Sequence, residues 1–142
     1  FNVSGFRSDQ RWFRKTAVGG AETVTVTNAN RIHYWVIQNT ATTFTRDAGQ
    51  DGYAGGAAMA WLAVTAPAAG VHLISGAAHS ENGTGGTVTI PDTYTQASNT
   101  TPAFHGTIAG HKTVTAGSLP VATPVVAGGN INWSTTSVVV SA

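Results

Sequence analysis

The chain has 142 residues, and its net charge at neutral pH is only +1. Charged residues make up 9% of the chain, whereas ordinary soluble domains contain about 25%. The length suits one domain with its own core, and the absence of cysteine excludes disulfides and thiolate zinc sites. A near-neutral chain attracts no nucleic acid at long range, and no apolar run approaches the roughly 20 residues of a membrane span, so neither partner is expected.

Residues 1–20 form the first predicted unit, an N-terminal arm or first strand that ends at Gly19-Gly20. Aromatic residues are interleaved with basic residues in this unit. These residue types are enriched in interface hot spots, because they bury large areas while keeping polar groups available. An amphipathic first strand with its charges in solvent is the alternative interpretation. The pattern predicts a protein–protein interface made by Phe6, Arg7, Arg11, Trp12, Phe13 and Arg14.

Residues 21–142 are predicted to form a single all-β domain, an antiparallel sandwich. Short runs rich in β-branched residues recur between Gly, Pro and Asn turn signals, and we expect about nine or ten short strands. A jelly-roll-like topology is the commonest way to close that many antiparallel strands. Residues 47–56 are predicted to be a glycine-rich loop, and 57–64 is favoured as a strand over a helix. The candidate runs for these strands are 22–27, 31–38, 42–46, 57–64, 71–75, 87–90, 93–96, 103–108, 112–115, 121–126 and 131–141, the last with an irregularity near Ser134.

No catalytic apparatus is recognisable, so the chain is predicted not to be an enzyme. The nucleophile-elbow pattern G-x-S-x-G is absent. Glycoside cleavage needs two facing carboxyl groups, but Asp47 and Asp51 share the glycine-rich segment, where Asp usually caps turns. The run 83–86 (GTGG) is not followed by Lys-Ser/Thr, so it does not indicate a phosphate loop. We therefore expect no catalytic residue, no cofactor and no small-molecule ligand.

A metal site is the next possibility, because the chain has five histidines. His79 and Glu81 would share one face of a strand, and His72 or His105 could supply a third ligand. Isolated strand histidines more often pack or bond to the backbone, and no H-x-H pair occurs. The prediction is that no residue binds a metal.

The four tryptophans provide an alternative function. Trp35 and Trp61 lie in apolar runs and are predicted core residues. Trp12 and Trp133 have polar neighbours and are predicted at the surface, where they could stack on sugars. The alternative is therefore a carbohydrate- or receptor-binding tip domain of a phage tail fibre or spike, or a lectin-like module.

Several features together resemble the head-decoration, or capsid-cementing, proteins of tailed bacteriophages. They are the low charge, the Thr/Ala/Gly-rich strands, the aromatic–basic arm, the loop DAGQDGYAGGAA and the closing VVAGGNINWSTTSVVVSA. In size and texture the chain is similar to the jelly-roll cementing protein of a Bordetella phage. The resemblance implies a non-enzymatic structural protein that bridges neighbouring subunits of the major capsid protein. It also implies a symmetric homo-oligomer on the exterior of the virion, assembled in the host cytoplasm.

Overall fold

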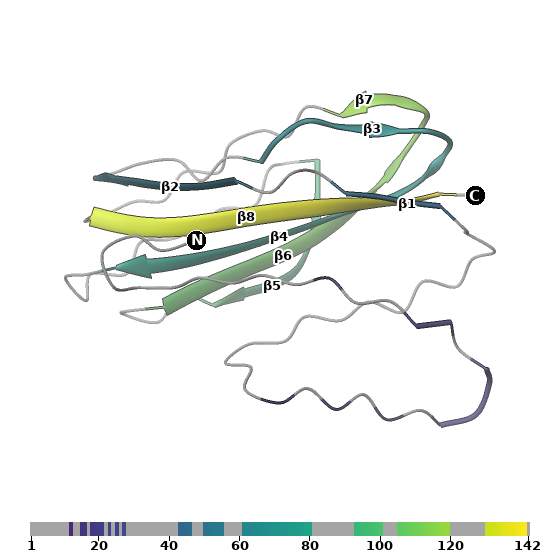
Figure 1. Ribbon diagram of the computed structural model, residues 1–142, viewed down its shortest axis with the longest axis horizontal. Helices are drawn as coiled ribbons and strands as arrows, with labels where there is room; N and C mark the ends of the chain where they lie inside the picture. The colour runs from purple at the N-terminus through teal and green to yellow at the C-terminus, as the bar shows by residue number, and fades with distance from the viewer. Residues whose placement is uncertain are drawn as a thin grey trace.

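A computed structural model describes residues 12, 15–16, 18–21, 23, 25, 27, 43–46, 50–55, 61–80, 93–100, 105–119 and 130–141. Across these residues the protein has eight strands and no helix, and hence no helix that could cross a membrane (Figure 1). The predicted all-β class is confirmed. The strands are β1 (Thr43–Arg46), β2 (Gln50–Gly55), β3 (Val64–Ala66), β4 (Gly70–Ser80), β5 (Thr95–Thr100), β6 (His105–Val114), β7 (Gly117–Leu119) and β8 (Asn130–Ser141).

The larger of two antiparallel sheets has six strands, in the order β1-β8-β4-β6-β5, with β2 also paired to β8. Strand β8, yellow in Figure 1, therefore lies between β4 on one side and both β1 and β2 on the other. The β4–β8 ladder runs without a break from Gly70–Ser141 to Ser80–Ile131. Long unbroken ladders of this kind specify the register of the whole sheet. The jelly-roll topology itself stays a prediction.

The smaller sheet pairs β3 with β7 and packs against one face of the larger sheet, here called the inner face. Val64 and Ala66 of β3 pack with Val139 of β8 and Val114 of β6, and Leu119 of β7 lies against this cluster. Period-two alternation explains the pattern, since Val64 and Ala66 are buried while Thr65 between them is exposed. This cluster holds the two layers of the sandwich together.

The opposite, outer face of the larger sheet is also covered. Leu73, Val138 and Val140 are almost completely buried there, and Trp12 packs against them together with Val71. Strand β8 is consequently buried on both faces, so its run Val138-Val139-Val140 is apolar throughout rather than alternating.

Several expectations about strand boundaries are wrong, including the strand favoured over 57–64, whose described residues 61–63 belong to no strand. Residues 50–55 are a strand rather than part of a loop, because residues 130–135 of β8 provide a partner for them. The two expected strands 103–108 and 112–115 are one strand, β6, whose Gly110 pairs with Ile74 of β4. Thr23, Thr25 and Thr27, expected in a strand over 22–27, belong to none. The expected strands 31–38, 87–90 and 121–126 lie outside the described residues.

The irregularity expected near Ser134 lies in the neighbouring strand instead. Arg46 pairs with Val138 and Gln50 pairs with Thr135, so four steps along one strand match three steps along β8. The register against β8 therefore differs by one residue between β1 and β2. Strand β8 itself continues straight through this point against β4.

Candidate interaction surface

Trp12 is the one predicted interface residue that the structure describes, and it lies against its own domain. Its ring packs on the outer face over the cluster of Leu73, Val138 and Val140, and it is half-buried. The indole Nε1 donates a hydrogen bond to Oγ1 of Thr136, 3.3 Å away. Trp12 therefore anchors the N-terminal segment to the sandwich. The remaining predicted interface residues lie outside the described residues; they are Phe6, Arg7, Arg11, Phe13 and Arg14.

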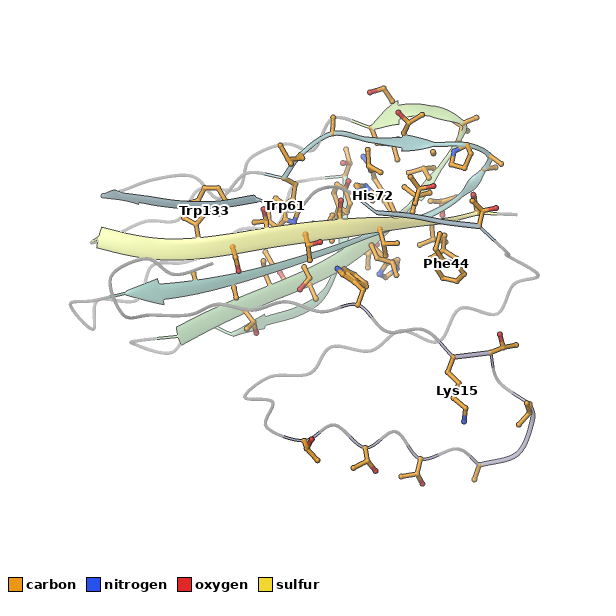
Figure 2. All side chains as sticks on the ribbon, in the orientation of Figure 1. Lys15, Phe44, Trp61, His72 and Trp133 are labelled. Carbon is orange, nitrogen blue, oxygen red and sulfur yellow. The ribbon has the colours of Figure 1, made fainter. Side chains whose placement is uncertain are left out.

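The described residues that follow Trp12, from Lys15 to Thr27, do not pack on the sandwich. Every described residue from Lys15 to Thr27 is exposed, and Val18 is 86% exposed. Figure 1 shows these purple residues away from the eight labelled strands, and Figure 2 places Lys15 far from the buried Trp61 and Trp133. We call the described residues of 15–27 the exposed arm. The sequence predicts the protein–protein interface at residues 6–14, and it does not indicate that residues 22–27 of the exposed arm are exposed.

A glycine pair lies in the middle of the exposed arm. Gly19 and Gly20 have φ angles of 90° and 78°, in the left-handed region that other residues adopt only at a cost. Nothing lies within 4 Å of a Cβ built on either glycine. These residues therefore serve to direct the backbone, and close packing does not require them.

The tryptophans are distributed differently from the sequence prediction. Trp61 is 5% exposed and its Nε1 donates a 3.0 Å hydrogen bond to the carbonyl oxygen of Ser75, as expected for a core residue. Trp133, predicted at the surface, is only 9% exposed. Its polar neighbours were misleading because Thr135 and Ser137, on the same face of β8, are themselves buried. Trp35 lies outside the described residues.

A polar cluster lies on the inner face, near the start of β4. His72 is fully buried, and its Nδ1 lies 2.7 Å from the hydroxyl oxygen of Tyr94. Lys112 of β6, the register partner of His72, places its Nζ 4.5 Å from the centroid of the Tyr94 ring. Burial raises the pKa of the Tyr94 phenol above its ordinary value, so the phenol is neutral at physiological pH. We interpret this cluster as a structural hydrogen bond and a cation–π contact.

The candidate metal ligands are brought together only in part. The register pairs His79 of β4 directly with His105 of β6. His72 lies seven positions earlier along β4, beside Tyr94, and cannot join them. Among the described residues no group of three or more His, Asp or Glu side chains is arranged to hold an ion. Glu81 lies outside those residues.

An exposed aromatic residue lies at the β1 edge of the outer face. Phe44 is 40% exposed and pairs with Val140, which is buried beside Leu73 and Val138. The apolar outer cluster therefore continues to the edge of the sheet. This position and the exposed arm are the two exposed features of the described structure that bear on binding. Comparison with protein-family models, with characterised proteins and with solved structures found no match.

Proposed function

We propose that the protein is a non-enzymatic structural component that decorates a viral capsid and cements it by bridging neighbouring capsid subunits. The observation that carries the proposal is an almost uncharged sandwich with an exposed arm. Beyond residue 51, the charged residues are Glu81, Asp92 and Lys112. The proposed partner is the major capsid protein, and the proposed location is the exterior of the virion after assembly in the host cytoplasm.

Low charge suits a protein that works inside an assembly. Burying a charge at an interface carries a large desolvation cost unless the charge is paired. A surface made mainly of Thr, Ser, Ala and Gly has little of this cost, but it also gives little protection against self-association. The proposed protein therefore forms a symmetric homo-oligomer whose copies share the load between capsid subunits.

The sandwich suits a load-bearing role. Strands β4 and β8 are joined along their whole length, and both faces of β8 are packed. Force applied at one end of β4 is thus distributed over a continuous ladder rather than a single hydrogen bond. The shell would open only after the added interfaces between subunits had broken.

Co-sedimentation tests this function. The purified protein is mixed with heads assembled from the major capsid protein of the same genome, and bound protein is measured after centrifugation. We expect saturable binding at a fixed number of copies per head and greater resistance of decorated heads to heat. The absence of binding at micromolar concentration would refute the proposal.

A glycan array distinguishes the alternative, a carbohydrate- or receptor-binding tip domain. Burial of Trp133 removes one of the two tryptophans expected at a sugar-stacking surface, and Trp12 packs on its own sheet. A cementing protein should show no saccharide preference. Saturable binding to one saccharide class would favour the tip domain instead.

A further inference from the structure

The exposed arm combines a strand-like sequence with an exposed position. Residues 22–27 read Glu-Thr-Val-Thr-Val-Thr, a period-two alternation with β-branched residues on both faces. Thr23, Thr25 and Thr27 are all exposed, and none belongs to a strand. A sequence with this preference gains stability when it pairs with the edge of a sheet. Within its own domain, the described residues of the arm do not do so.

Among the described strands the sheet has two edges, and they differ in how well they are protected. One edge is formed by β1 and β2, which include Arg46 and Asp51 and whose registers against β8 differ by one residue. Natural proteins use such irregularities and charges to prevent pairing with another chain. This edge is therefore a poor acceptor for an added strand.

The opposite edge is β5, which pairs only with β6 among the described strands. Its sequence Thr-Gln-Ala-Ser-Asn-Thr contains neither a charge nor a proline, and Thr95 and Gln96 are exposed. A register shift between Gln96 and Ser98 twists this edge. It is nevertheless the less protected of the two.

We propose that residues 21–27 add as an outer strand to the β5 edge of a second copy of this chain. The lengths agree, since the donor spans seven residues and the acceptor six. The proposed pair is antiparallel, with Thr25 opposite Gln96. The net charge of +1 offers little repulsion between copies. The inference rests on the self-association included in the proposed function and does not depend on the capsid.

Proline substitutions test the donor strand. Alternate residues of a strand direct their N–H groups to opposite sides, so only one set of alternate positions faces β5. Two double variants are compared, Thr23→Pro/Thr25→Pro and Val24→Pro/Val26→Pro, together with Thr23→Ser/Thr25→Ser, which keeps every N–H. The native mass of each is measured by light scattering.

Wild type and the serine variant should have a native mass of at least twice the 14.5 kDa of one chain. At least one proline variant should dissociate, with self-association weakened by about tenfold to a hundredfold. Monomeric wild type, or proline variants that both associate like wild type, would overturn the proposal. Because Thr23 and Thr25 are exposed, the dissociated Thr23→Pro/Thr25→Pro protein should keep the far-UV circular dichroism and cooperative unfolding of wild type, which serve as the folding control.

Engineered cysteines test the acceptor edge independently of any destabilising substitution, since the chain has no cysteine of its own. Thr25→Cys protein is mixed with mass-tagged Gln96→Cys protein under mild oxidation. Paired strands bring Cα atoms within disulfide range, so the mixed dimer should form about tenfold faster than with Thr65→Cys, an exposed position on β3. Equal rates would refute β5 as the acceptor.

The two proposals fail separately in these experiments. Strand addition without binding to heads would leave the inference intact and refute the capsid function. Binding of a monomeric protein to heads would refute strand addition and leave the capsid function intact.

Discussion

Gly70, the first residue of β4, provides the sharpest test of the packing between the central strands. It pairs with Ser141 of β8 on one side and with Val114 of β6 on the other. A Cβ placed on Gly70 would overlap the carbonyl oxygen of Val140 and lie 2.9 Å from Cα and 3.0 Å from Cβ of Ser141. Backbone atoms cannot rotate away as a side-chain end can, so the strands must separate.

The expected cost of Gly70→Ala follows from two contributions. Forcing a methyl group into a filled space costs about 1–3 kcal/mol, and disturbing the terminal ladder bonds adds about 1 kcal/mol. The free energy of unfolding should therefore fall by about 3 kcal/mol. In a domain of this size each kcal/mol lowers the unfolding temperature by about 2–4 °C, which gives a total decrease of about 6–12 °C.

Urea and thermal unfolding, followed by tryptophan fluorescence, measure this change because Trp61 and Trp133 are buried. The matched control is Gly19→Ala, at a position with open space but a φ of +90°. The control carries only the conformational cost of a left-handed residue, about 1 kcal/mol. If Gly70→Ala proves no more destabilising than Gly19→Ala, β4 and β8 do not approach as closely as described.

Three further predictions concern Trp12, Tyr94 and metal content. Replacing Trp12 by Ala should lower the free energy of unfolding by about 2 kcal/mol, since removal of a half-buried ring costs part of the 3–5 kcal/mol typical of fully buried aromatics. Trp12→Phe should recover most of this loss. Unchanged stability of Trp12→Ala would contradict the packing of Trp12 on the outer face. Because burial raises the pKa of Tyr94, the unfolded chain loses this proton at lower pH than the folded protein, so stability should fall as pH rises above about 10, by up to about 1.4 kcal/mol per pH unit. Tyr94→Phe should be less stable at neutral pH by about 1 kcal/mol, through the lost bond to His72, yet decline less steeply in alkali; parallel curves for the two proteins would refute this. Elemental analysis of untagged protein should find no stoichiometric Zn, Fe, Mn or Ni, and retention of one ion per chain would contradict this prediction and make the paired His79 and His105 the first positions to substitute.

The fold class could be predicted from the sequence because strand periodicity is a local signal. Expected strands at 42–46, 71–75 and 131–141 agree with β1, part of β4 and β8. Strand β2 could not be predicted in this way, since its glycines indicate a loop. It is a strand because β8 offers it an edge, and that pairing spans some 80 positions of sequence.

The candidate surface was predictable only in part. Aromatic and basic composition drew attention to Trp12, but composition does not show whether an aromatic ring faces a partner or its own sheet. Trp133 shows the same difficulty in reverse, because Ser and Thr beside it suggest solvent although β8 buries them. Residues 22–27, the last part of the exposed arm, were predicted to be a strand, and whether such a pattern pairs depends on which edges the rest of the fold leaves available.

The central position of β8 has a consequence for how the protein is made. β8 lies last in sequence among the described strands, yet it joins β4 to β1 and β2. A ribosome delivers β1, β2 and β4 before β8, so the ladders that these three strands form with β8 must wait until it has emerged. Pairings this distant in sequence close slowly, on the millisecond to second scale typical of all-β domains. Synthesis therefore sets a natural order, in which β4, β5 and β6 can pair first and β1 and β2 join the sheet only once β8 has entered it.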